Sequence, residues 1–335
     1  MPNNIKSKKK AAFITGVSGQ DGSYLAEFLL EKGYEVHGLV RRVAAENQGE
    51  RFSRIDHILS KIHLHHGDVS DYPTVWRLIA DLEPDEVYHL AAQSFVEESF
   101  KDPVSTLRIN INGTQYLLSA IKELRPQCRF YFAATSEMYG RVFESRQSEK
   151  TPFNPVSPYG IAKLASFYLT RMHREGQGLF AVSGILFNHE SPRRSTEFVT
   201  RKITSAAAKI KLGLARDLRL GNLEAKRDWG YAPDFVQAMW LMLRQKTPKD
   251  YVIGTGEAHT VREFVEEAFG YLGLDWKKYV KTDKALLRPA EVGHLCANAR
   301  RAGRDLGWKP KVGFKELVQM MVDSDLAAVS AGHRK

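Results

Sequence analysis

The most informative stretch for the fold is Gly16-Val17-Ser18-Gly19-Gln20-Asp21-Gly22. An apolar run, Ala11–Thr15, precedes it, and a helical pattern at 23–32 follows it. Glycines at such a turn let the backbone approach a pyrophosphate, and the N–H groups that begin the helix favour an anion. A glycine pattern alone is weak evidence, but its position between a strand and a helix makes it stronger. We therefore predict a dinucleotide-binding turn rather than an ordinary strand-to-helix turn.

Apolar runs and helical patterns alternate along the first half of the chain. Further strands are expected at 35–40, 62–65, 86–90, 129–134 and 180–187, and helices near 74–82, before 123 and at 159–173. This alternation predicts an α/β fold with a doubly wound parallel sheet, as in Rossmann domains.

The rhythm of the elements changes after residue 187. Helices are expected at 197–212, 231–243, 261–272 and 314–325, a short strand at 218–220, and a late strand of the main sheet at 251–253. We therefore expect a Rossmann domain of residues 1–187 plus about 229–255. A smaller, interleaved α/β lobe would comprise about 188–228 plus 256–335.

Composition narrows the class of protein. The chain has 335 residues, which fits roughly two domains, and its two cysteines, Cys128 and Cys296, match no metal-ligand or disulfide pattern. From the cysteines we expect no metal and a reducing, cytoplasmic setting. No apolar run is long enough to span a membrane, and the first ten residues are not expected to act as a signal peptide. The net charge of +10 is compatible with nucleic acid or with phosphate-rich ligands. Because the basic residues are scattered, no nucleic-acid partner is predicted.

The end of the second expected strand predicts the type of cofactor. Sites that prefer NAD usually carry Asp or Glu there, to hold the ribose hydroxyls. Here Arg41 and Arg42 follow the strand instead. Guanidinium groups suit a 2′-phosphate, so we predict NADP rather than NAD. We prefer this interpretation to an exposed basic turn that binds nothing. Further cofactor contacts are expected at the carboxyl ends of the third and fourth strands, from Asp68, Val69, Leu90, Ala91, Ala92, Gln93 and Ser94.

Tyr159 and Lys163 form a Tyr-x-x-x-Lys pair. On a helix the two side chains share one face, and an ammonium beside a phenol would lower the pKa of the phenol from ~10 toward neutrality. The tyrosine would then be a usable base for a sugar hydroxyl. Thr135-Ser136-Glu137 ends the fifth expected strand, at the same edge of the sheet. We interpret these two groups as one catalytic site rather than as polar loop ends.

Together these motifs resemble the extended short-chain dehydrogenase/reductase family, which acts on sugar nucleotides. Longer stretches resemble the GDP-mannose 4,6-dehydratases in order and spacing, over about residues 11–325. The most specific are the Asn-His-Glu-Ser-Pro run that begins at Asn188 and the Lys-Arg-Asp-Trp-Gly run that begins at Lys226. The matching stretches are 16–38, 91–96, 135–140, 184–194, 198–203, 220–230, 251–263 and 288–292.

The resemblance implies a reaction and roles for named residues. GDP-mannose would become a GDP-4-keto-6-deoxy sugar and water, with a hydride lent to NADP from C4 and returned to C6. Tyr159 would take the proton of the 4-hydroxyl, Thr135 would bond near the 4-oxygen, Lys163 would hold the nicotinamide ribose, and Glu137 would remove the C5 proton. The implied catalytic residues are Thr135, Glu137, Tyr159 and Lys163.

The resemblance also assigns the binding residues and the lobes. The Rossmann domain would bind NADP, and the smaller lobe would bind the GDP-sugar. Cofactor contacts would come from Gly16, Ser18, Gly19, Gln20, Asp21, Gly22, Arg41, Arg42, Asp68, Val69, 90–94, Tyr159, Lys163, His189 and Arg194. Substrate contacts would come from Ser94, Thr135, Ser136, Glu137, Asn188, Lys202, Arg227, Arg288 and Glu291. Arg227 with Asp228, and Arg288 with Glu291, could instead form surface ion pairs, and Trp229 is expected to pack in a core.

The chain departs from the family pattern in three places. One is the stretch 297–302, Ala-Asn-Ala-Arg-Arg-Ala, where a Gly-Asp/Asn-Pro-x-Lys-Ala turn is usual. Ser105 stands where a cofactor-proximal tyrosine is usual, and Gly293 and His294 stand near the nucleotide-binding residues where an acid and an apolar residue are usual. These differences leave room for a related substrate such as a GDP-heptose. A nucleotide-sugar epimerase or reductase is the competing enzyme, and a scaffold or RNA-binding protein without turnover is the competing non-enzyme. The resemblance suggests a homodimer or homotetramer in which the segment 41–54 reaches a neighbouring subunit, and no membrane partner.

Overall fold

The computed structural model describes residues 9–42, 51–287 and 292–333. Within these residues, parallel strands form one seven-stranded sheet in the order β11-β6-β5-β4-β1-β2-β3. This order confirms the predicted doubly wound sheet, and the expected late strand at 251–253 lies at its edge. The strands are β1 Ala11–Thr15, β2 Glu35–Val40, β3 His63–His66, β4 Glu86–His89, β5 Arg129–Thr135, β6 Ala181–Leu186 and β11 Tyr251–Ile253.

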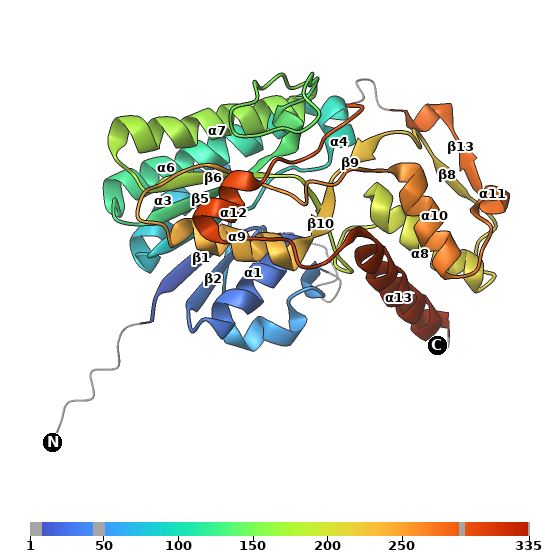
Figure 1. Cartoon of the computed structure of the whole chain (residues 1–335). Coiled ribbons are helices and arrows are strands. Elements are labelled where there is room, and N and C mark those ends of the chain that lie inside the picture. Colours follow the sequence, from blue (N-terminus) through green and yellow to red (C-terminus); the bar gives the residue numbers. More distant parts are fainter. Residues whose placement is uncertain (1–8, 43–50, 288–291, 334–335) are drawn as a thin grey trace.

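Helices cover both faces of the sheet (Figure 1). Side chains alternate along each strand, so that Ile14 joins the core under one set of helices and Phe13 joins the core under the other. The first core lies against α1 Gln20–Glu31 and α9 Ala232–Leu243. The second core lies against α3 Tyr72–Leu82, α6 Gly113–Leu124 and α7 Pro158–Gln177. Because both faces are buried, the central strands are mostly apolar, although β4 also carries the buried Glu86 and His89.

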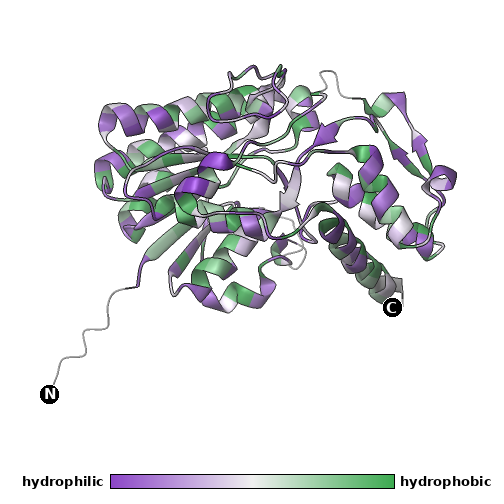
Figure 2. Ribbon diagram, in the orientation of Figure 1, coloured by the Kyte–Doolittle hydropathy of each residue, from purple (hydrophilic) through white to green (hydrophobic). Residues whose placement is uncertain are grey.

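A third core lies apart from the main sheet, on the right of Figure 1. It is built from α8 Val199–Lys211, α10 Val261–Tyr271 and α13 Phe314–His333. Beside these helices, β8 Leu218–Leu220 pairs in parallel with β13 Val280–Thr282. In Figure 2 the helices of this part carry apolar residues on one side and polar residues on the other, as expected for surface helices.

Two short strand pairs connect this part to the main sheet. Strand β7 Asn188–Glu190 pairs in parallel with β10 Trp229–Tyr231, and β9 Lys226–Arg227 pairs with β12 His259–Thr260. These strands could not be predicted from the sequence, because two or three residues are too few to show a period. The remaining short elements are η1 Asp56–Lys61, α4 Val96–Lys101, α5 Pro103–Leu107, η2 Arg108–Asn112, η3 Ser136–Met138, α11 Trp276–Tyr279, η4 Lys284–Leu286 and α12 Arg300–Leu306.

The longer predicted elements agree with the structure to within a few residues at each end. The largest difference is α13, which continues to His333 rather than ending near residue 325. Within the described part of the chain, no helix is both long enough and apolar enough to cross a membrane. The residue boundaries of the two expected domains stay a prediction.

Candidate active site

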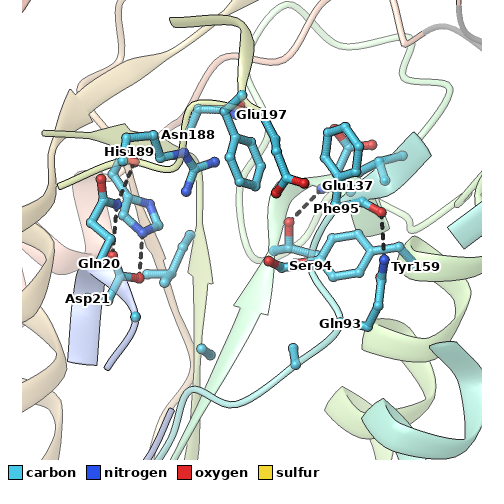
Figure 3. A pocket seen from close by; sticks show the side chains of 18 of the residues that line it. Gln20, Asp21, Gln93, Ser94, Phe95, Glu137, Tyr159, Asn188, His189 and Glu197 are labelled. Atoms are coloured by element: carbon cyan, nitrogen blue, oxygen red, sulfur yellow. Dashed lines mark hydrogen bonds and ion pairs between the residues drawn. The ribbon is translucent and has the colours of Figure 1, made fainter. Parts of the chain in front are cut away.

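A cavity of about 730 Å³ opens at the carboxyl ends of the parallel strands and lies in the size range of small-molecule sites, ~300–1,000 Å³. All described residues predicted for cofactor or substrate line this cavity except Arg42, which is exposed. Arg288 and Glu291 lie outside the described residues. Figure 3 shows the cavity with Gln20 and Asp21 on one side and Glu137 and Tyr159 on the other.

The glycine turn has the geometry of a phosphate cradle. Gly16 has φ of +79°, and a Cβ there would lie 2.9 Å from the backbone nitrogen of Ala91. A Cβ on Gly22 would lie 2.2 Å from the carbonyl oxygen of Gly16. Helix α1 begins after Gly19, and no side chain caps it. The turn therefore presents bare backbone at a helix N-terminus, which fits a dinucleotide diphosphate.

A second observation also fits a ligand in this cavity. Gln93 donates from its Nε2 to the carbonyl oxygen of Phe95 at 3.0 Å, but its buried Oε1 has no hydrogen-bond partner among the described residues. A buried acceptor without a partner is costly unless a ligand or water satisfies it.

The predicted catalytic residues meet where β5 ends. Thr135 accepts a hydrogen bond from the backbone N–H of Glu137 at 3.2 Å and is also hydrogen bonded to Tyr159. Helix α7 carries Tyr159 and lies close to the end of β5. This close approach requires a glycine, because a Cβ on Gly160 would lie only 2.8 Å from the carbonyl oxygen of Glu137. The Lys163 Nζ, one turn further along α7, donates to the carbonyl oxygen of Ala133 at 2.8 Å.

The expectation that Lys163 lowers the pKa of Tyr159 is wrong for this structure. Burial raises the pKa of the Tyr159 phenol and outweighs the opposing effect of its hydrogen bond to Thr135. Burial also lowers the pKa of Lys163 to about 7, against the opposing effect of Asp21. Because both side chains are removed from water, each favours its neutral form. Sequence spacing alone could not reveal this burial.

Asp21 and His189 form a short ion pair on the opposite wall of the cavity. His189 Nε2 lies 2.7 Å from Asp21 Oδ2, and His189 Nδ1 lies 2.7 Å from the carbonyl oxygen of Phe187 (Figure 3). Gln20 donates to the carbonyl oxygen of His189 at 3.1 Å and accepts from Ser191 at 2.8 Å. These bonds tie the glycine turn to strand β7.

Asn188, Lys202 and Arg227 line the part of the cavity next to the third core. Arg227 is 6% exposed and donates to the carbonyl oxygens of Lys226 and Val292. The hypothesis of a surface ion pair between Arg227 and Asp228 is therefore wrong, because both residues are buried.

The two residues that follow Arg227 stabilise the fold around the cavity. Asp228 accepts hydrogen bonds from the backbone of Thr255, Gly256 and Ala297, as well as from the Thr255 hydroxyl. Trp229 packs against Phe264 and Phe314, as expected, although it also borders the cavity.

Some residues that line the cavity were not predicted as site residues from the sequence motifs. Phe95 and Phe198 contact each other edge to face, with ring centroids 5.7 Å apart, and the Arg194 guanidinium lies 3.5 Å from the centroid of the Phe198 ring. Glu197 is exposed and points into the cavity near Glu137 in Figure 3. These side chains come from loops and from short helix ends, which carry no periodic pattern in the sequence.

Residues 13–321 match the family model described as GDP-mannose 4,6 dehydratase. GDP-mannose 4,6 dehydratase 2 of Arabidopsis thaliana is 51% identical over 336 residues, which cover 97% of this chain and 89% of that protein. The UDP-glucose 4-epimerase of Thermus thermophilus, solved with NAD, is 28% identical with a TM-score of 0.82, over 95% of this chain and 99% of that one. RMD of Pseudomonas aeruginosa, solved with NADPH, is 25% identical with a TM-score of 0.77, over 96% and 98%. This chain therefore belongs to the GDP-mannose 4,6-dehydratase family.

Proposed function

We propose that the protein converts GDP-mannose to GDP-4-keto-6-deoxymannose and water with the help of tightly bound NADP. The observation that carries this proposal is the position of Glu137. Its backbone N–H donates a hydrogen bond to Thr135, and Thr135 in turn lies beside Tyr159. A simple alcohol dehydrogenase has no use for a carboxylate there. A dehydratase needs one, because the proton next to the new ketone must be removed before water can leave.

The described residues divide the reaction between them. Tyr159 acts as the phenolate and takes the proton of the sugar 4-hydroxyl, and Thr135 holds the 4-oxygen by a hydrogen bond. Burial opposes the phenolate in the cofactor-free protein, and the positive nicotinamide ring of bound NADP would favour it. Bound NADP would supply hydride acceptance at C4 and hydride return at C6. Glu137 removes the C5 proton and passes a proton to the C6 hydroxyl, which leaves as water. The sugar loses one water and the cofactor is unchanged overall, so no external oxidant or reductant is needed.

One feature supports NADP over NAD. Arg41 lines the cavity beyond β2, where an acidic residue would favour NAD. The similar structures include proteins solved with either cofactor, NADPH in RMD of Pseudomonas aeruginosa and NAD in the epimerase of Thermus thermophilus. A dissociation constant for NAD equal to or below that for NADP, measured by calorimetry, would contradict this part of the proposal.

Isotope transfer tests the whole reaction. GDP-mannose carrying deuterium at C4 should give a product with deuterium at C6 of the same sugar, detected by mass spectrometry. Glu137→Gln serves as the matched control, because it keeps the size of the side chain and removes the base. Release of one NADPH per sugar, or an epimerised product that retains its oxygen at C6, would overturn the proposal. A GDP-heptose offered in competition would decide between the two sugars.

The lobes and the assembly complete the proposal. We propose that the part built on the third core holds the GDP-sugar, through Asn188, Lys202 and Arg227, and that the Rossmann domain, 1–187 plus about 229–255, holds NADP. A homodimer or homotetramer and a cytoplasmic setting are the accompanying expectations. Light scattering of the purified protein would contradict the first if it gave the mass of one chain.

A further inference from the structure

Asp21 is an unexpected residue in a turn that is proposed to receive a diphosphate. It occupies the first turn of α1, where the N–H groups and the helix dipole attract anions. Its carboxylate lines the same cavity as the glycines of the turn and is one-fifth exposed. An unpaired carboxylate there would repel the diphosphate that the turn is shaped to bind. Its partner is therefore of functional interest.

That partner, His189, carries a positive charge by geometry. Both of its ring nitrogens face an acceptor at 2.7 Å, Nδ1 the carbonyl oxygen of Phe187 and Nε2 the Asp21 carboxylate. A neutral imidazole has one donor and one acceptor, so only the doubly protonated ring satisfies both contacts. The ring stacks on Phe235 with centroids 4.6 Å apart, which fixes its plane.

We propose that His189 is a positioning residue that acts through Asp21. Its imidazolium cancels the charge of the Asp21 carboxylate, so that the glycine turn accepts the NADP diphosphate, and it fixes the turn against β7. The proposal rests on the proposed NADP dependence. The family resemblance implied that His189 contacts the cofactor. Because both ring nitrogens are already engaged within the protein, the proposal assigns the ring a role through Asp21 rather than a direct hydrogen bond to NADP.

The surrounding charges agree with this role. Although burial alone would raise the pKa of Asp21, the neighbouring His189 holds it below its ordinary value. Burial likewise opposes the charge of His189, but Asp21 raises the pKa of the imidazole above its ordinary 6.5. The other groups that face the pair are Arg194 after β7, Lys163 and Tyr159 on α7, and Tyr131 on β5.

The alternative is that the Asp21–His189 ion pair only holds α1 against β7. Two variants distinguish this structural role from the proposed cancellation of charge. His189→Gln leaves the Asp21 charge unpaired, whereas Asp21→Asn breaks the same ion pair but removes that charge. We expect His189→Gln to weaken NADP binding to the cofactor-free protein by roughly tenfold or more, measured by calorimetry. Asp21→Asn should bind at least as tightly as the wild type, and the double variant should recover most of the loss.

A matched control is available on the same helix. His57 pairs with Glu27 of α1 at 2.5 Å, outside the cavity. His57→Gln should therefore leave the dissociation constant for NADP unchanged. The proposal is overturned if Asp21→Asn weakens binding as much as His189→Gln does, because a structural tie predicts equal losses. It is also overturned if His189→Gln binds like the wild type.

The charge of His189 can be measured directly in the absence of cofactor. Nitrogen-15 NMR of the cofactor-free protein should show both ring nitrogens of His189 protonated at neutral pH, and Asp21→Asn should move the titration to lower pH. A singly protonated ring at neutral pH would contradict the proposal. If the wild type binds no NADP, the proposed cofactor is wrong and this role falls with it. If the wild type binds but the variants do not differ, only the role of His189 fails.

Discussion

Replacing Lys163 with methionine should stabilise the cofactor-free protein while abolishing its activity. Lys163 is 3% exposed, and burial lowers its pKa from the ordinary 10.5 to about 7. At ~1.4 kcal/mol for each tenfold change in proton affinity, the charged side chain costs the folded state roughly 5 kcal/mol at acidic pH. Lys163→Met removes that cost but also the hydrogen bond to Ala133, worth about 1–3 kcal/mol. We expect a net gain of roughly 2–4 kcal/mol.

The sign of the pH dependence follows from the lowered pKa. Below about pH 7 the folded protein bears the full cost of the Lys163 charge, and the cost disappears as the pH rises toward 10.5. Urea denaturation of the cofactor-free proteins should therefore show a gain for Lys163→Met near pH 6 that vanishes near pH 10. Turnover should fall by roughly a hundredfold or more.

An exposed lysine provides the control for this experiment. Lys209→Met, on the surface of α8, should show no pH-dependent gain in stability. The reasoning is refuted if Lys163→Met is no more stable than the wild type near pH 6. It is refuted equally if its advantage is the same at both pH values, because the gain would then come from packing and not from the buried charge.

Three further substitutions test the site and its support. Glu137→Gln should abolish water elimination while NADPH absorbance still appears on mixing with GDP-mannose; a normal yield of product would contradict the role of Glu137. Arg41→Ala should weaken NADP binding by about tenfold and leave NAD binding unchanged, measured by calorimetry; equal losses would exclude a contact with the 2′-phosphate. Asp228→Ala should cost about 3 kcal/mol in urea denaturation, because buried N–H groups of Thr255 and Ala297 lose their acceptor; a loss below about 1 kcal/mol would show that water replaces it.

The main sheet and its glycine turn could both be predicted from the order of the residues. The central strands are buried on both faces, so most of their residues are apolar, and these runs stand out between helical patterns. The turn is equally readable, because Gly16 and Gly22 stand where a side chain would collide with the backbone. Tyr159 and Lys163 could be paired in advance, since one helical turn fixes their relation.

Which charges meet, and how deeply they are buried, depends on the folded arrangement and could not be predicted. Asp21 and His189 are separated by 168 residues, and no local pattern relates them. Strand β7, which carries His189, has three residues and is defined only by its pairing with β10. The burial of Lys163 and Arg227 likewise depends on elements far away in the chain. Spacing and periodicity report neighbours along one element, whereas pKa values and ion pairs depend on neighbours in space, which the fold alone assembles.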